Sequence, residues 1–145
     1  MLKGIPAVIS PELMKILMEM GHGDEIVFSD ANFPASSHAK RLVRCDGIGI
    51  IQLLDAILGF FPLDYAVDQP VCIMNVPPSV SYKPEIWDSY RACIGKYDKR
   101  TSFEGVDRFE FYERSKAAYA VVVTGERTRF ANIILKKGII SEQTC

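Results

Sequence analysis

The chain has 145 residues, of which 48% are hydrophobic and 24% are charged, and its formal net charge is −1. These values predict a single globular domain over residues 1–145, and they give no electrostatic support for partners such as nucleic acid or an anionic membrane. No apolar run approaches the roughly 18 residues needed to span a bilayer, and the N-terminus lacks the apolar stretch of a secretory signal, so we expect a cytoplasmic protein.

The first half of the chain predicts helices that alternate with short strands. Ser10-Pro11 has the pattern of a helix N-cap followed by proline at the first helical position. Apolar residues then recur at helical spacing as far as Met20, and Gly21 is expected to end this helix. Further on, the sequence predicts a strand over residues 25–29, a loop over 32–37, a strand over 41–44 and a helix from Gly47 that Pro62 stops.

The second half predicts a buried strand over residues 71–76 and a helix from Pro84 to Ile94. Asp107 and Glu110 have the spacing of a capping pair, which predicts a helix over residues 107–118. The runs 119–124 and 132–136 are rich in strand-forming residues and are joined by a short glycine-containing turn, which predicts a hairpin. Helices alternating with apolar strands favour a three-layer α/β/α domain, and the last two strands predict a mixed sheet.

The segment from Met20 to Pro34 carries the most informative chemistry. His22 stands between two glycines, and a histidine with its ordinary pKa near 6.5 is suited to proton transfer at neutral pH. Asp30 follows the strand and can either fix the tautomer of His22 or hold a sugar hydroxyl. We therefore expect His22 and Asp30 at one rim of the fold. The alternative interpretation is that His22 is a surface residue contacting the end of the preceding helix.

Other residues have simpler interpretations. Four widely spaced cysteines, Cys45, Cys72, Cys93 and Cys145, are expected to be reduced and structural, and no spacing predicts a zinc site. No glycine-rich nucleotide-binding motif and no acyl-transfer motif is present. Solvated positions are predicted for His38 in its serine-rich loop, for Glu25, for the charged face of the helix over residues 108–116, and for the pair Lys136-Lys137.

Several ordered blocks of sequence carry a family resemblance. They are Ile9-Ser10-Pro11-Glu12-Leu13, Met20-Gly21-His22-Gly23-Asp24-Glu25-Ile26, Ser29-Asp30-Ala31-Asn32-Phe33-Pro34, Asp46-Gly47, Arg108-Phe109-Glu110-Phe111-Tyr112-Glu113-Arg114, Thr124-Gly125-Glu126, and the stretch from Asn132 to Gly138. In these blocks the chain resembles the L-fucose mutarotase branch of the D-ribose pyranase/L-fucose mutarotase family. The block that begins at Arg108 favours the fucose branch over the ribose branch.

The resemblance implies an isomerase that interconverts the α and β anomers of L-fucose without a metal or organic cofactor. It implies that His22 is the catalytic acid/base, and that Asp30, Arg108 and the segment Phe130-Ala131-Asn132 bind the sugar. That segment usually reads Tyr-Gly-Asn in the family, so Phe130 lacks a hydroxyl and Ala131 adds a methyl group. The family also forms ring-like homo-oligomers, commonly decamers, with sites near subunit contacts.

Two other functions stay open from the sequence. A D-ribose pyranase would interconvert pyran and furan forms with similar residues. A non-catalytic, sugar-binding regulatory subunit would use the same pocket without exchange of anomers.

Overall fold

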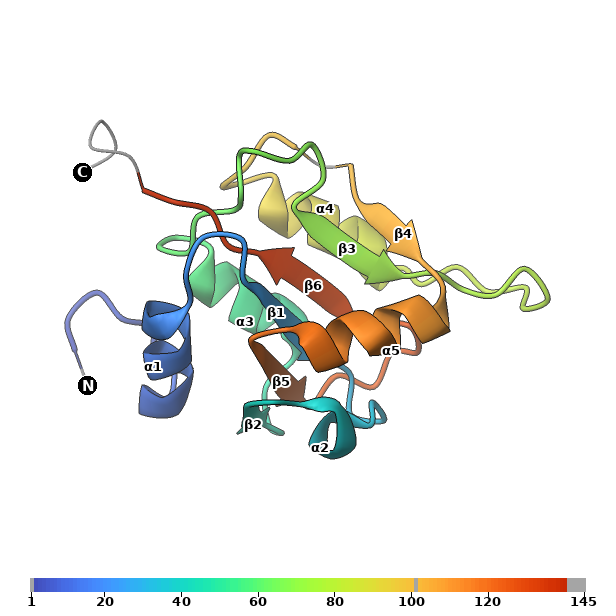
Figure 1. Cartoon of the computed structure of the whole chain (residues 1–145), viewed down its shortest axis with the longest axis horizontal. Helices are drawn as coiled ribbons and strands as arrows, with labels where there is room; N and C mark the ends of the chain where they lie inside the picture. The colour runs from blue at the N-terminus through green and yellow to red at the C-terminus, as the bar shows by residue number, and fades with distance from the viewer. Residues whose placement is uncertain (1, 101, 141–145) are drawn as a thin grey trace.

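Six strands form one mixed sheet through the middle of the molecule (Figure 1). The computed structural model describes residues 2–100 and 102–140, and its strand order is β2-β5-β1-β6-β3-β4. The strands are β1 (Glu25–Ser29), β2 (Leu42–Cys45), β3 (Val71–Met74), β4 (Glu104–Val106), β5 (Ala120–Thr124) and β6 (Ile133–Lys136). Strand β6 runs antiparallel to β1 and β3, whereas the other pairs are parallel. The predicted mixed sheet is confirmed.

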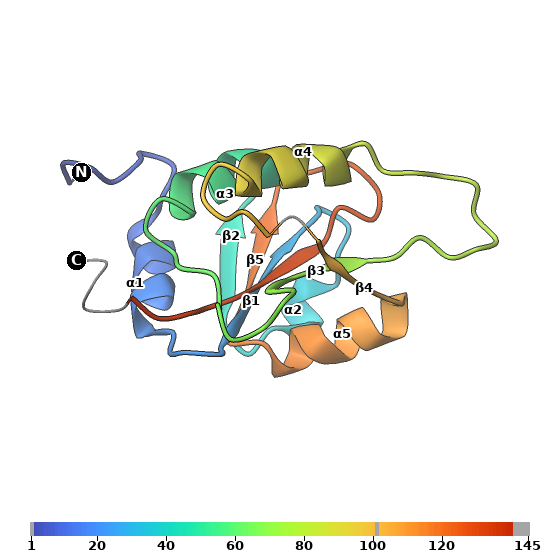
Figure 2. The same ribbon diagram turned by 90° about the horizontal axis from the view of Figure 1, so that it is seen from above.

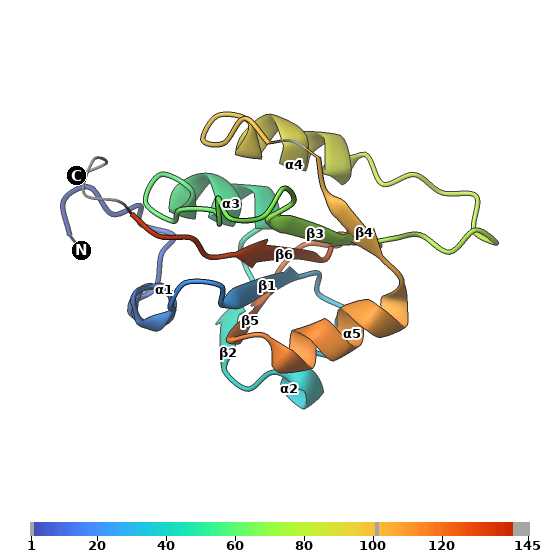
Figure 3. The same ribbon diagram turned by 45° about the horizontal axis from the view of Figure 1, so that its top comes forward.

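Helices cover both faces of this sheet. Helices α3 (Ile50–Ile57) and α4 (Ile86–Ile94) lie on one face, and α5 (Arg108–Ala117) with the short α2 (Ala35–His38) lies on the other, as Figures 2 and 3 show. Helix α1 (Pro11–Glu19) joins the same core cluster as α3 and α4. The predicted three-layer α/β/α architecture is therefore confirmed. Among the described residues, no helix is both long and apolar enough to cross a bilayer.

The central strand β1 divides its side chains between the two layers. Ile26 and Phe28 pack into the cluster beneath α1, α3 and α4, whereas Val27 packs beneath α5. This alternation follows from the two-residue period of a strand. All three side chains are fully buried. The core on both faces thus anchors β1, and its two ends hold the loops that carry His22 and Asp30.

The predicted hairpin of residues 119–124 and 132–136 is wrong. Strand β1 lies between β5 and β6, pairing Val27 with Val121 in parallel on one side and with Ile134 antiparallel on the other. The side chains of β1 from Ile26 to Ser29 are buried on both faces of the sheet, which is typical of an interior strand. The connection from β5 to β6 must therefore cross the end of β1. That crossing brings residues 125–132 to Asp30, where the Ala31 N–H donates to the Glu126 carbonyl oxygen at 2.8 Å.

The helix starts follow local sequence, but one helix end does not. The Leu13 N–H donates to Ser10 Oγ at 3.1 Å, and Asp107 Oδ1 accepts from the first turn of α5, as predicted. Gly21 does not cap α1 in the left-handed conformation, because Met20 already leaves the helix with extended backbone (φ −64°, ψ 137°). The left-handed residue is Gly23, with φ +83°.

Two short elements were not predicted. Helix α2 forms within part of the stretch expected to be a loop, and β4 was not expected at all. Elements of three or four residues are too short to show a periodic pattern of apolar residues.

Candidate functional site

A cavity of about 440 Å³ opens where β1 ends. Four of the six predicted site residues line it: Asp30, Arg108, Phe130 and Asn132. Its other lining residues are Asn32, Phe33, Met74, Tyr112 and Arg129. Acidic, amide, cationic and aromatic groups thus surround one small space, which is the mixture that a polyhydroxylated ring with one apolar face requires.

Asp30 is the buried acid of this cavity, with only 6% of its surface exposed. Its Oδ1 accepts from the Asn32 N–H at 2.9 Å, and its Oδ2 accepts from Asn132 Nδ2 at 3.0 Å. Burial raises the pKa of Asp30 above its ordinary value, although these hydrogen bonds act in the opposite direction. An ionised carboxylate has about four acceptor sites. Asp30 therefore keeps acceptor capacity for hydroxyl groups of a ligand.

Arg108 is the first residue of α5, and its guanidinium lies over the Phe109 ring, 4.9 Å from the ring centroid. The helix dipole disfavours a cation at a helix N-terminus, so this position does not stabilise the helix. A locally unfavourable residue at a cavity is typical of a functional role. Tyr112, which the sequence interpretation missed, lines the same cavity. Its spacing of four from Arg108 was the available signal, because such residues share a helix face.

The segment Phe130-Ala131-Asn132 divides between the cavity and the core. Phe130 has a left-handed backbone (φ 59°), and its ring lies beneath the Arg129 guanidinium at 5.5 Å. Ala131 is fully buried, does not line the cavity, and accepts a hydrogen bond from the Tyr90 hydroxyl through its carbonyl oxygen at 2.5 Å. Phe130 and Asn132 are therefore placed for contact with a ligand, whereas the Ala131 methyl group is not.

His22 lies at the opposite end of β1 from Asp30, so the expectation that both occupy one rim is wrong. The loop with His22 precedes Glu25, and Asp30 follows Ser29, so the whole strand separates them. A strand advances about 3.3 Å per residue. The two side chains of one chain therefore cannot contact the same monosaccharide.

At its own end, His22 pairs with an acid that the sequence did not indicate. His22 Nε2 lies 3.1 Å from Asp64 Oδ1, and the side chains are 47% and 5% exposed, respectively. Asp64 Oδ1 also accepts from the Ala66 N–H at 3.0 Å. Burial acts to raise the pKa of Asp64, but the hydrogen bonds from Ala66 and His22 and the nearby positive charges hold it below its ordinary value. Asp64 is ionised at neutral pH.

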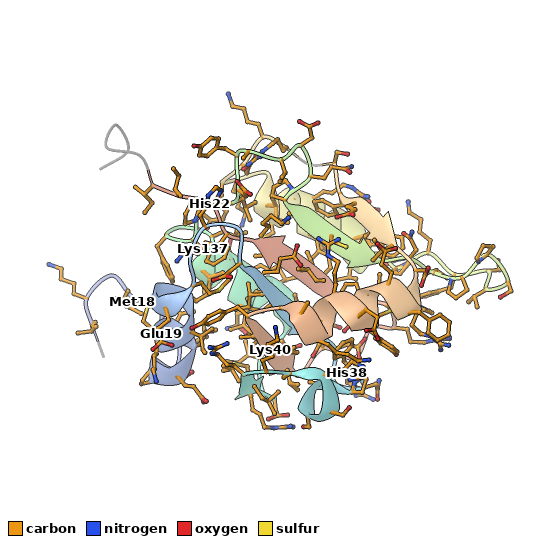
Figure 4. The ribbon with its side chains drawn as sticks, viewed as in Figure 1. Met18, Glu19, His22, His38, Lys40 and Lys137 are labelled. Atoms are coloured by element: carbon orange, nitrogen blue, oxygen red, sulfur yellow. The ribbon has the colours of Figure 1, made fainter. Side chains whose placement is uncertain are left out.

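The Asp64 carboxylate orients the imidazole of His22. An ionised carboxylate can only accept, so it favours the tautomer in which Nε2–H donates to Asp64 and Nδ1 carries the free lone pair. The ring borders a space of about 400 Å³ whose walls are mostly apolar, among them Met18, Phe60 and Ile140. This end of the molecule therefore presents an oriented acid/base group beside an apolar wall, and Figure 4 labels His22 and Met18 there.

Glu25, His38 and Arg114 were expected to be solvated, but each packs against or pairs with other side chains. His38 packs between Phe33 and Tyr112, with ring centroids 5.8 and 5.2 Å apart, because the unpredicted α2 turns it toward α5. Arg114 donates to Glu25 and Glu104, each at 2.7 Å, across the sheet surface.

Within residues 2–100 and 102–140, no group of three His, Cys, Asp or Glu side chains is placed to hold a metal ion.

Comparison with known proteins places the chain in a family. Residues 3–140 match the RbsD / FucU transport protein family. The L-fucose mutarotase of Actinobacillus pleuropneumoniae serotype 5b (strain L20) is 49% identical over 140 residues, covering 96% of this chain and 97% of the relative. The fucose mutarotase of Mus musculus is 48% identical over 145 residues, covering 96% of this chain and 95% of that relative.

A solved structure agrees with these relatives. The fucose mutarotase from Streptococcus pneumoniae in complex with L-fucose is similar to this chain with a TM-score of 0.91 at 53% identity, covering 97% of this chain and 100% of that one. Both the sequence and the fold match over almost the whole length. The chain therefore belongs to the RbsD / FucU transport protein family.

Proposed function

We propose that this protein is an L-fucose mutarotase, an isomerase that interconverts the α and β anomers of the sugar. The observation that carries the proposal is the likeness to the Streptococcus pneumoniae fucose mutarotase, whose structure contains L-fucose. The cavity at Asp30 supports it, because its acid, amide, cation and aromatic ring suit a deoxysugar with several hydroxyl groups and one methyl group. The mutarotase domain spans residues 1–145 in this proposal.

The chemistry needs only proton transfer and positioning. Mutarotation protonates the ring oxygen and deprotonates the anomeric hydroxyl, after which the open aldehyde rotates about C1–C2 and closes from the other face. His22, oriented by Asp64, exchanges the proton through Nδ1, a role worth roughly 10²–10⁴-fold in rate. Asp30 and Arg108 hold the other hydroxyl groups, so that only the anomeric centre moves.

A complete site then needs two copies of the chain. His22 and Asp30 lie at opposite ends of β1, so we infer that His22 of one subunit reaches the Asp30 cavity of another. Large apolar side chains are exposed near His22, including Met18 at 76% and Ile140 at 57%, and Phe109 is 69% exposed beside Arg108. A contact between two different surfaces of the same chain generates a ring when the rotation between neighbouring subunits closes. This supports the ring-like homo-oligomer, a decamer by resemblance.

Mixing two impaired variants, assayed at a low L-fucose concentration, tests the shared site. In His22→Ala every subunit keeps the Asp30 cavity, and in Asp30→Ala every subunit keeps His22. If sites are shared, co-assembled 1:1 mixtures regain activity in about one quarter of the sites, because each site draws one residue from each of two subunits. Light scattering on the unsubstituted protein should give a mass many times 16.2 kDa. A fully active monomer would exclude the shared site.

Saturation-transfer NMR on L-fucose tests the function itself and separates it from the alternatives. Anomer exchange above the spontaneous rate on L-fucose supports the mutarotase. Faster exchange between pyran and furan forms of D-ribose would instead indicate a pyranase. Binding of either sugar without exchange would indicate a regulatory subunit.

We also propose a cytoplasmic location, in keeping with the buried free thiols of Cys45, Cys72 and Cys93.

A further inference from the structure

The geometry points to Lys137 as a positioning residue for His22: its ammonium and its backbone together hold the loop that carries the histidine. This inference rests on the proposed function, in which His22 transfers the proton. The sequence predicted a solvated pair at Lys136-Lys137, and for Lys137 that prediction is wrong. Its side chain is half-buried and lines the same space as His22, and Figure 4 labels both residues at the same end of the molecule.

The ammonium of Lys137 binds free carbonyl oxygens at the C-terminal end of α1. Lys137 Nζ donates to the Leu17 carbonyl oxygen at 2.9 Å and to the Met20 carbonyl oxygen at 2.5 Å. The last four carbonyl groups of a helix lack partners within it, and a cation there also interacts favourably with the helix dipole. Helix α1 has no basic residue in its own last turn. Lys137, which directly follows β6, therefore supplies the cation that the last turn of α1 lacks.

The backbone of Lys137 holds the other side of the same loop. The Gly23 N–H donates to the Lys137 carbonyl oxygen at 2.8 Å, and the Lys137 N–H donates to the Asp24 carbonyl oxygen at 2.8 Å. His22 lies between Met20, which the ammonium holds, and Gly23, which the backbone holds. One residue thus fixes the chain on both sides of the imidazole.

The same short stretch also holds Asp64. The Asp64 N–H donates to the Lys136 carbonyl oxygen at 3.0 Å, and the Gly138 N–H donates to the Pro62 carbonyl oxygen at 2.8 Å. A Cβ atom at Gly138 would lie 2.6 Å from the Leu63 carbonyl oxygen, so this close approach requires glycine. The extension of β6 therefore sets the position of His22 relative to its carboxylate partner.

Lys137→Met tests this inference, because methionine keeps an unbranched apolar stem and removes the ammonium. Lys40→Met is the matched control: Lys40 Nζ donates to the Ala117 carbonyl oxygen at 3.0 Å, at the end of α5. The first measurement is structural. We expect faster amide hydrogen exchange at Gly23 and altered imidazole NMR signals of His22 in Lys137→Met only. His38, the other histidine of the chain, provides an internal reference.

The second measurement compares how much kcat and KM each change in Lys137→Met. Misplacing a catalytic group by about 1 Å costs on the order of 10²-fold in rate, so we expect kcat to fall about 10- to 100-fold. KM should stay within about threefold, because the Asp30 cavity is unchanged. Lys137→Arg, which keeps a cation, should restore most of the loop protection and most of kcat.

The outcomes separate the inference from the function on which it rests. Normal kcat and unchanged Gly23 exchange and His22 signals in Lys137→Met would overturn the role of Lys137. If the methionine variant does not fold, Lys137→Gln, which is neutral but polar, is measured in the same way with the same expected losses. If the unsubstituted protein shows no anomer exchange, the proposed function fails, but hydrogen exchange at Gly23 still decides whether Lys137 holds the loop.

Discussion

Asn132 binds Asp30 through both ends of its side-chain amide. Its Nδ2 donates to Asp30 Oδ2 at 3.0 Å, and its Oδ1 accepts from the Asp30 backbone N–H at 2.9 Å. Both residues are buried. Asn132 therefore fixes the orientation of the carboxylate at the end of β1, and its contribution to sugar binding acts in part through Asp30.

Asn132→Asp should weaken L-fucose binding. A second carboxylate at position 132 removes the amide donor to Asp30 Oδ2 and repels the Asp30 carboxylate. We expect a loss of about 1–3 kcal/mol in binding free energy, the cost of leaving a buried polar group without its partner. Isothermal titration calorimetry measures this loss. Unchanged affinity would mean that the orientation of Asp30 does not matter to the sugar.

Asp30→Ala and Arg108→Ala should each reduce affinity for L-fucose. Hydrogen bonds from charged groups to ligand hydroxyls are worth about 1.5–3 kcal/mol when they are desolvated. Arg44→Ala is a suitable control, since Arg44 pairs with Asp46 in an exposed ion pair where each side chain is 57% exposed. If Asp30→Ala and Arg108→Ala bind L-fucose as tightly as Arg44→Ala does, neither Asp30 nor Arg108 contributes to sugar binding.

His22→Ala should abolish most of the anomer exchange while leaving the fold intact. The half-exposed ring contributes little packing, whereas general acid/base catalysis is worth roughly 10²–10⁴-fold. Saturation-transfer NMR gives the rate, and circular dichroism reports the fold. In the matched variant His38→Ala the loss should be smaller, since His38 packs on Tyr112 without lining the cavity. A folded His22→Ala protein with near-normal exchange would refute the assignment.

Asp64→Asn should lower kcat and change the acid stability of the protein. The amide can donate to Nε2 and so stabilises the other tautomer, and we expect at least about 10²-fold loss of rate. The folded pKa of Asp64 lies below its ordinary value of 3.8. Its ionised form therefore contributes stability that is present above pH 3.8 and is lost as the pH falls through the folded pKa.

Thermal unfolding between pH 3 and pH 7, measured on both proteins, checks this second effect. The stability of Asp64→Asn should fall less steeply on acidification than that of the unsubstituted protein. If stability falls with pH in parallel for the two proteins, the contacts of Asp64 with His22 and Ala66 do not contribute to the stability of the folded state.

Phe130→Tyr should change catalytic efficiency by no more than about tenfold, because a neutral hydrogen bond contributes roughly 0.5–1.5 kcal/mol. The phenylalanine ring keeps its apolar contact with the cavity, and only the hydroxyl is missing. Comparing kcat/KM for the two proteins on L-fucose checks this. An inert unsubstituted protein that becomes active as Phe130→Tyr would place the hydroxyl in the proton relay.

The sequence by itself determined the elements and contacts that depend on neighbouring residues. Ser10 and Asp107 start their helices because each side chain bonds backbone groups within three positions. The apolar run of β3 predicted a buried strand, and the residues of β1 and β5 predicted strands. The family blocks led to His22, Asp30, Arg108 and Asn132 as candidate site residues. These signals are local, so they are readable without knowing where the chain goes next.

Only the tertiary structure decided how these parts meet. Asn132 reaches Asp30 across 102 positions, Asp64 reaches His22 across 42, and Lys137 reaches Met20 across 117. The insertion of β1 between β5 and β6 replaced the predicted hairpin and placed Asn132 beside Asp30. The same strand separates His22 from Asp30 within one chain. Strand order follows from burying both edges and both faces of β1 at once, which depends on the whole core rather than on any local pattern.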